Sequence, residues 1–356
     1  MRKTRKKQKK PVMFFLLLIV LLIVFFGGSF KNLYELITKE DKTAKEVVSI
    51  DVSNNIKEIK LFDDGLLFRN NKTIKSYHLN GKLNWSKEAK DLSELNNNIF
   101  ISDNSEISSF DIDGNSLWKV NTNKRIMSMI EDKGHLFVFT KNKKDLLQID
   151  VIDEFGNTIS NVVIDKKPLL AYMNKDKKSF IVTTLGVEDN TIVSEILAYK
   201  LDGSKIYSYS LKDEIIEDLV FDDKKIIATT DKKIFSLQNG KLFWEKDLKS
   251  IVADIDYYNN YCYLLLDNEA KNRLEIIDNK GKVILNKQLN EKYDKLLVNK
   301  EKIYLKNNKK IIGFTNKGKE FFQYNKDNIM DFAIRDESLI IYTNYNLLVY
   351  KLVDEN

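Results

Sequence analysis

The sequence predicts an all-β protein, an eight-bladed β-propeller of four-stranded blades with seven blades as the alternative, preceded by one N-terminal transmembrane helix. Three observations predict this architecture: an uncharged 20-residue stretch near the N-terminus, seven regularly spaced glycines between strand-like runs, and no helical pattern within a repeat. A chain of 356 residues with 43% hydrophobic residues can bury a sizeable core.

The positive charge is concentrated at the N-terminus. The formal net charge is +6, and residues 1–10 contain seven basic residues and no acidic one. The rest of the chain is therefore about neutral, which argues against a nucleic-acid partner.

The apolar stretch at residues 11–30 is predicted to be a transmembrane helix, because at about 1.5 Å per residue it spans a hydrocarbon core of roughly 30 Å. The basic residues 1–10 then form a cytoplasmic tail, and the remainder lies outside the cell membrane as an extracytoplasmic domain. Residues 31–45 are expected to form a juxtamembrane helix and stalk, and residues 46–356 the propeller. A cleaved signal ending near Gly27, Gly28 and Ser29 is the alternative, and either reading exports the domain.

Cys262 is the only cysteine. It excludes an intramolecular disulfide, a four-cysteine zinc site and a paired-cysteine redox motif. An exported domain of this kind depends on its apolar core.

Seven glycines recur between strand-like runs and predict one hairpin in each repeat, because glycine accepts the positive φ of a tight turn. Their spacing averages 39.5 residues, the length of a four-stranded blade. They are Gly81, Gly114, Gly156, Gly203, Gly240, Gly281 and Gly318.

A large apolar residue stands four positions after six of these glycines, and Ser160 takes the place in the third repeat. The even spacing places these side chains on one face of each last strand, where they are expected to pack between repeats. They are Trp85, Trp118, Tyr207, Trp244, Leu285 and Phe322.

One repeat is divided into four predicted strands, at residues 215–222, 225–230, 233–238 and 241–247. An eighth copy starts at Ile329 and ends without a glycine turn or a last strand. The strand-like residues 46–52 are expected to fill that place and close the ring, which removes exposed strand edges.

Asp113-Gly114 with Trp118 and Asn239-Gly240 with Trp244 resemble the blade motif of the quinoprotein-type, or PQQ-like, β-propellers. In that family the tryptophans dock one blade on the next, so the resemblance implies a structural role for them. The quinone-dependent dehydrogenases of this fold also use calcium and often a vicinal disulfide, which one cysteine excludes. Anchor and repeats together also resemble uncharacterised surface proteins of low-GC Gram-positive bacteria.

Few residues indicate chemistry. His78 and His135 lie in different repeats and are interpreted as ordinary strand or turn positions, and no nucleophile elbow or phosphate-binding loop is present. The tyrosines of the run YYNNYCY, residues 257–263, fit either core packing or a recognition surface. No cofactor, metal or catalytic residue is predicted.

The predicted function is a non-catalytic binding or scaffolding module at the outer face of the membrane, for a protein or an envelope polymer. The alternative is an enzyme, either a degenerate quinoprotein or a glycan hydrolase with carboxylates at the propeller channel. A sensor that signals through the helix is a third reading, but only about ten residues precede the apolar stretch.

Overall fold

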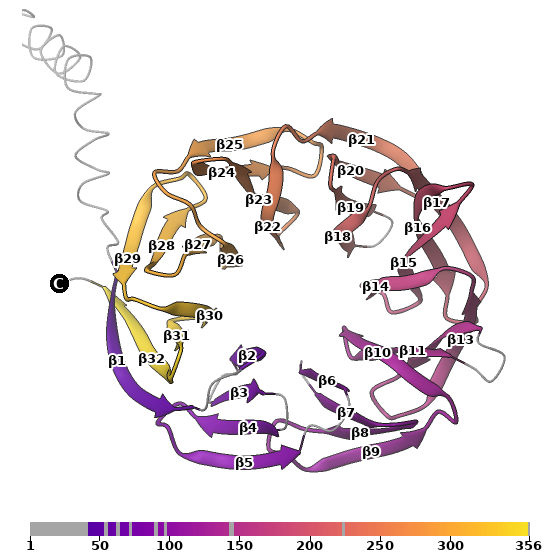
Figure 1. The fold of residues 1–356 in the computed structure, drawn as a ribbon, viewed down its shortest axis with the longest axis horizontal. Coiled ribbons are helices and arrows are strands. Elements are labelled where there is room, and N and C mark those ends of the chain that lie inside the picture. The colour runs from indigo at the N-terminus through magenta and orange to yellow at the C-terminus, as the bar shows by residue number, and fades with distance from the viewer. Residues whose placement is uncertain are drawn as a thin grey trace, which may run out of the picture. The chain divides into compact units, whose positions relative to one another are not determined.

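The computed structural model describes residues 42–52, 56–61, 65–70, 73–88, 92–95, 98–141, 146–222 and 225–354. All regular elements in these ranges are β-strands, and the sheets are arranged around a central axis (Figure 1). The predicted all-β propeller fold is confirmed. The predicted transmembrane helix at 11–30 and the basic tail at 1–10 lie outside the described residues, and no helix within the described ranges is long and apolar enough to cross a membrane.

Six sheets have four antiparallel strands each, in sequence order from the axis outward. The first two contain β2 (Glu58–Leu61), β3 (Gly65–Arg69), β4 (Thr73–His78) and β5 (Leu83–Glu88), then β6 (Leu92–Leu95), β7 (Ile99–Asp103), β8 (Glu106–Phe110) and β9 (Ser116–Asn121). The next two contain β10 (Arg125–Asp132), β11 (His135–Lys141), β12 (Leu147–Ile152) and β13 (Thr158–Ile164), then β14 (Lys167–Met173), β15 (Ser179–Glu188), β16 (Thr191–Lys200) and β17 (Lys205–Lys212).

The last two four-stranded sheets follow the same plan. They contain β18 (Ile216–Asp222), β19 (Lys225–Thr230), β20 (Lys233–Gln238) and β21 (Lys241–Asp247), then β22 (Ile251–Tyr258), β23 (Tyr261–Asn268), β24 (Lys271–Ile277) and β25 (Val283–Gln288). The strands predicted for residues 215–247 agree with β18 to β21 to within one residue. Alternating apolar and polar residues produce the half-buried outer strands, such as β21.

A seventh sheet has eight strands in the order β26-β27-β28-β29-β1-β32-β31-β30. It therefore joins two sets of four strands through the neighbours β29 and β1. Its strands are β26 (Lys295–Asn299), β27 (Lys302–Lys306), β28 (Lys310–Thr315), β29 (Glu320–Asn325), β30 (Ile329–Arg335), β31 (Ser338–Thr343), β32 (Asn346–Asp354) and β1 (Lys42–Asp51).

Strand β1 lies between β29 and β32, the place expected for residues 46–52. It begins at Lys42, earlier than the predicted propeller boundary at Glu46, so the last residues of the predicted stalk are strand. The polar run is held in the sheet because both of its edges are paired.

The direction of β1 follows from contacts near its middle and at its end. The Val52 amide donates to the Tyr345 carbonyl between β31 and β32, and the Tyr350 hydroxyl donates to Glu46 Oε2 at 3.1 Å. Strand β1 thus begins beside the end of β32, and the chain enters the sheets at the end that carries the glycine turns.

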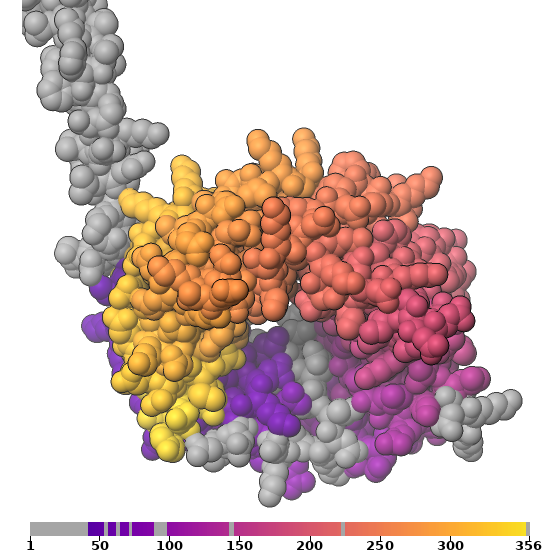
Figure 2. Space-filling view, turned by 45° about the horizontal axis from the view of Figure 1, so that its top comes forward, coloured from indigo at the N-terminus to yellow at the C-terminus, as the bar shows by residue number. Residues whose placement is uncertain are grey.

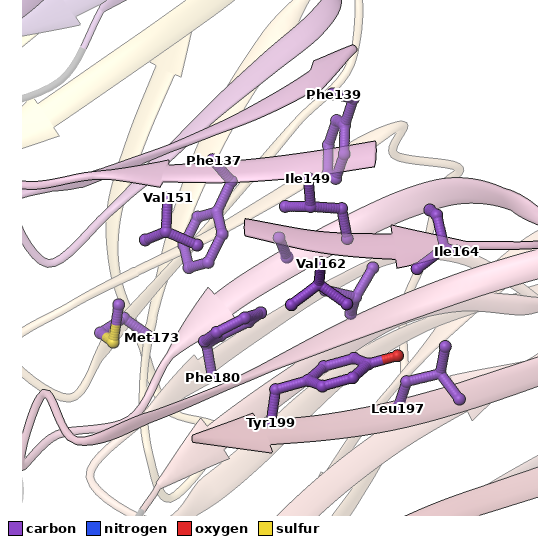
Figure 3. Packing of buried hydrophobic residues seen from close by; sticks show 12 residues of the cluster. Phe137, Phe139, Ile149, Val151, Val162, Ile164, Met173, Phe180, Leu197 and Tyr199 are labelled. Atoms are coloured by element: carbon purple, nitrogen blue, oxygen red, sulfur yellow. The ribbon is translucent and has the colours of Figure 1, made fainter. Parts of the chain in front are cut away.

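The apolar core lies between neighbouring sheets. Figure 3 shows one such layer, in which Phe137 of β11 faces Phe180 of β15, with ring centroids 5.6 Å apart. Tyr199 of β16 stacks on the other side of Phe180 at 5.5 Å. Comparable clusters recur between other pairs of sheets, so burial of apolar area joins each sheet to the next. At the centre of the ring the surface is hollowed (Figure 2).

Candidate functional site

The seven turn glycines all have positive φ, between 76° and 88°. At Gly240 a Cβ atom would also stand 2.6 Å from Cγ of Tyr207, and at Gly114 it would stand 3.0 Å from the Trp85 ring. Glycine is required there by both the turn and the close approach of a ring.

The residue four positions after one turn glycine packs on the turn glycine of the next sheet. This contact needs a ring or a branched side chain at the residue four positions after the first glycine. It also needs a residue without a side chain, glycine, at the turn of the next sheet. The pairs are Trp85 on Gly114, Trp118 on Gly156, Tyr207 on Gly240, Trp244 on Gly281 and Leu285 on Gly318.

Each tryptophan of this set also makes the same hydrogen bond. The indole N–H donates to the backbone carbonyl two residues before the turn glycine of the next sheet. The bonds are Trp85 to Ile112 at 2.8 Å, Trp118 to Glu154 at 2.9 Å and Trp244 to Asn279 at 3.2 Å. The indole N–H is the single donor of a half-buried tryptophan side chain, and these carbonyls accept from it.

The remaining motif positions depart from this pairing. Among the described residues no ring lies close to Gly203: the nearest atom to a Cβ is the Asn161 carbonyl oxygen at 3.4 Å, and the buried Ser160 hydroxyl has no hydrogen-bond partner in this part of the chain. Gly81 is instead met by Val48 of β1 at 2.7 Å. Phe322 is buried beside Tyr304 in the eight-stranded sheet.

Several innermost strands carry a β-bulge followed at once by an aspartate. Register shifts precede Asp218 in β18, Asp254 in β22 and Asp331 in β30. Each carboxylate accepts the amide of the residue after it, at 2.7 to 3.0 Å. A bulge disrupts the ladder locally, and the aspartate gives this amide a partner.

The inner carboxylates also join neighbouring sheets. Asp254 accepts the Leu296 amide and Asp256 accepts the Val298 amide, both at 2.6 Å, which fixes β26 against β22. Two junctions earlier in the ring, the Tyr172 hydroxyl of β14 donates to Asp218 of β18 at 3.0 Å. Figure 1 shows these strands side by side at the inner ends of their sheets.

Burial raises the pKa of these carboxyl groups. It raises the pKa of Asp256 to about 6, against amide hydrogen bonds that lower it, and the nearby charge of Asp254 adds to the increase. The pKa values of Asp218 and Asp254 are raised for the same first reason. Raised carboxyl pKa values occur at active sites and in structural networks alike, and these groups hold the sheets together.

Other candidate chemical groups are placed in ordinary surroundings. Cys262 is fully buried, and the His135 ring nitrogen Nδ1 lies 3.2 Å from the Lys133 carbonyl oxygen. Within the described ranges, no three residues among His, Cys, Asp and Glu are grouped to hold a metal ion.

A pocket of about 410 Å³ opens among the turns that join first to second strands. Its concave shape and mixed apolar and polar lining make it a candidate ligand site. Its lining residues come from four sheets: Lys133, Lys175, Val220, Phe221, Lys225, Ile227, Tyr257, Tyr258, Asn259, Asn260, Tyr261 and Asn279.

The tyrosine run of residues 257–263 divides between core and pocket. Tyr263 is buried with 1% of its surface exposed, whereas Tyr258 and Tyr261 flank a tight turn and line the pocket. Asn259 and Asn260 form that turn with φ values of 51° and 67°. Core packing therefore applies to Tyr263, whereas Tyr258 and Tyr261 are placed where a recognition surface would need them.

The lysines of the pocket were not singled out in the sequence, because single lysines in separate repeats give no motif. Lys133, Lys175 and Lys225 come from three different sheets. Each of these lysines lies within or beside the turn between the first and second strands of its sheet, and this shared position was the one available signal.

Sequence comparison matches residues 92–352 to a protein family described as a family of unknown function, DUF5711. The chain belongs to DUF5711. The match includes six of the seven turn glycines and every residue that lines the pocket. Curated proteins give no match to this DUF5711 chain.

Solved structures similar to the DUF5711 chain are β-propellers. BamB from Moraxella catarrhalis has a TM-score of 0.58 and 12% identity, over 87% of this chain and 100% of the other. The WD40 domain of SCAP from fission yeast has a TM-score of 0.54 and 8% identity, over 87% and 98%. BBS1N, solved in complex with ARL6DN, has a TM-score of 0.50 and 11% identity, over 88% and 98%. At these identities the similarity establishes the fold alone.

Proposed function

We propose that this protein is a membrane-anchored, extracytoplasmic β-propeller that acts as a non-catalytic binding or scaffolding module for a protein or cell-envelope partner. The anchor is the apolar stretch 11–30, with the basic residues 1–10 in the cytoplasm. The PQQ-like blade motif and the Gram-positive surface-protein resemblance belong to this proposal.

The blade count in this proposal is eight. The eight-stranded sheet contains two sets of four strands, and β1 completes the second set from the opposite end of the chain. Six other sheets supply the remaining blades.

The observation that carries the proposal is the pocket formed by turns of four sheets. The sheets that present these turns are fixed to one another by core layers, by ring-on-glycine contacts and by the bond from the Tyr172 hydroxyl to the Asp218 carboxylate. A rigid frame loses little conformational freedom when a partner docks on its turns. The solved complex of BBS1N with ARL6DN is an example of a similar propeller with a protein partner.

The enzyme alternative receives no comparable support. A glycan hydrolase needs two carboxyl groups facing the scissile bond. Asp218, Asp254 and Asp256 instead accept hydrogen bonds from backbone amides or from Tyr172, which commits them to the frame.

Partner capture tests the function. The full-length chain carrying a proximity-labelling enzyme at its C-terminus is compared in cells with residues 1–41 carrying the same enzyme. We expect a reproducible set of envelope proteins or polymers that only the full chain labels. Identical labelling by the two chains would refute the binding role.

Topology is tested with an introduced cysteine. Because Cys262 is buried, Lys271→Cys on the exposed start of β24 is expected to be the one reactive thiol in the folded domain. We expect a membrane-impermeant maleimide to label it in intact cells. Labelling only after lysis would place the domain in the cytoplasm and refute the proposed location.

A further inference from the structure

The pocket among the first-to-second-strand turns is rich in hydrogen-bond donors. Its described lining contains three lysines and three asparagines, and no aspartate or glutamate. Lysine ammonium groups donate only, and asparagine amides add two donors each. In a domain that is about neutral, this lining favours an anion.

The three lysine ammonium groups differ in the hydrogen bonds and ion pairs that they already make within the protein. Lys133 Nζ donates to the Met173 carbonyl at 2.7 Å and lies 3.5 Å from the Phe221 carbonyl oxygen and from Asp132. Lys225 Nζ donates to the Asn279 carbonyl and lies 5.1 Å from the centre of the Phe243 ring. For Lys175, no ion pair or hydrogen bond of the ammonium to a described residue is seen.

Lys225 is also partly desolvated. Burial lowers its pKa, against the nearby charge of Asp278, which raises it. Two carbonyl-bound ammonium groups are fixed in position, that of Lys133 with Asp132 as its ion-pair partner at 3.5 Å, whereas no partner of the Lys175 ammonium is seen among the described residues. A bound anion would pair with Lys175 and replace hydration that Lys225 has lost.

The rest of the lining is largely apolar and aromatic. It includes Val220, Phe221, Ile227, Tyr258 and Tyr261. Such a lining packs the carbon skeleton of a glycerol or a sugar, and the tyrosine hydroxyls can bond its oxygens. A volume of about 410 Å³ accommodates more than an inorganic anion.

The kind of donor distinguishes between anions. The described lining contains lysines and no arginine, and the flat fork that matches a planar carboxylate is that of an arginine guanidinium. A phosphate group presents acceptor oxygens in several directions, and lysine binds it as a point charge.

The pocket lies at the end of the sheets where the chain enters. Asn279 belongs to the glycine turn of its sheet, and β1 starts at the glycine-turn end.

We propose that the pocket lined by Lys133, Lys175 and Lys225 binds the phosphate group of a glycerol phosphate or sugar phosphate. The inference rests on the proposed binding function and names the chemistry of its ligand. The phosphate can belong to a lipid headgroup or to a soluble or polymeric phosphate, and the two sources are separated below.

The test uses the full-length chain in maltoside micelles, which carry no phosphate. Glycerol 3-phosphate and inorganic phosphate are titrated by calorimetry at low salt. We expect saturable binding of glycerol 3-phosphate, tighter than that of inorganic phosphate, that weakens as salt is added. Lys175→Gln and Lys225→Gln should each weaken it about fivefold or more, because each removes a charged donor.

The matched control is Lys271→Gln, which removes an exposed lysine at the other end of a sheet. It should leave the affinity unchanged. Circular dichroism of each variant confirms that the fold is kept. Absent binding, or binding that both pocket variants leave intact, would overturn the proposal.

Mixed micelles with phosphatidylglycerol distinguish the sources of phosphate. If the lipid headgroup occupies the pocket, the apparent affinity for glycerol 3-phosphate falls as the lipid is added. If the ligand is a soluble or polymeric phosphate, the affinity is unaffected; either result upholds the site. Partner capture without phosphate binding would refute this site but not the scaffold, and phosphate binding without partner capture would do the opposite.

Discussion

Gly240→Ala should destabilise the domain in two separable ways. The residue has φ of 77°, and an added Cβ would stand 2.6 Å from Cγ of Tyr207 on the preceding sheet. The left-handed backbone costs about 1–2 kcal/mol for a residue with a Cβ. Forcing a ring from a packed contact costs about 1–3 kcal/mol more. The expected loss of unfolding free energy is therefore about 2–5 kcal/mol.

Gly134→Ala separates the two terms. Gly134 has φ of 80°, but the nearest atom to its Cβ is Nζ of the flexible Lys177 at 3.8 Å. This variant should show the backbone term alone. In a Tyr207→Ala background the ring is gone, so Gly240→Ala should then cost about as much as Gly134→Ala.

The assay is urea unfolding of the full-length chain in detergent, followed by tryptophan fluorescence. All three tryptophans belong to the sheet junctions, and none is changed in these variants. Equal losses for the two glycine variants, or strict additivity of Gly240→Ala with Tyr207→Ala, would refute the ring-on-glycine interpretation.

Three further predictions concern the inner carboxylates, a buried ion pair and the closing strand. Because the folded-state pKa of Asp256 is raised to about 6, the folded state binds the extra proton, so the unfavourable contribution of this group is full at pH 7 and disappears as the pH falls toward 4. Asp256→Asn removes the charge but also one of the two oxygens that accept backbone amides, so its effect on stability should be more favourable at pH 7 than at pH 4 by about 1–3 kcal/mol, in urea titrations at both pH values; an equal effect at both would contradict the assignment. Lys124→Met should cost about 3 kcal/mol in the same assay, because it leaves the Asp150 carboxylate buried without its cation at 2.9 Å; a loss below 1 kcal/mol would show that other partners suffice. A chain that starts at residue 56 lacks β1 and should unfold at lower urea and self-associate in gel filtration, whereas a chain that starts at Lys42 should keep the full-length midpoint; equal midpoints would show that β1 is dispensable.

The repeat architecture was predictable because its determinants are local. A turn that requires positive φ selects glycine, and a ring four residues later lies on a fixed face of the strand. The strand bounds of β18 to β21 therefore agree with the pattern to within one residue. The expectation that residues 46–52 complete the last set of strands came from counting repeats, which is also a property of the sequence alone.

The candidate site could not be predicted in the same way. Asp254 and Asp256 accept amides from β26, a strand about 40 residues further along the chain, and nothing in either segment indicates that pairing. The start of β1 at Lys42 depends on its pairing with β29 and β32, whereas its sequence reads as a polar stalk. Long-range partners supply the missing information in both cases.

The local sequence motifs and the residues that line the pocket have different roles in this protein. The recognisable signals, Gly114 with Trp85 or Gly281 with Trp244, are used at the junctions between sheets, and these contacts stabilise the frame. The pocket is built from residues in and beside turns, and for one of them, Lys175, no bond of the ammonium group to a described residue is seen. Trp85→Phe removes an indole bond to the Ile112 carbonyl, away from the pocket, and should lower stability by about 1 kcal/mol or more with little effect on phosphate affinity. Lys175→Gln should do the reverse, because no described residue depends on its ammonium group. If each substitution changed both stability and phosphate affinity, the residues that bind the ligand would also be residues that stabilise the fold, and this separation of roles would be wrong.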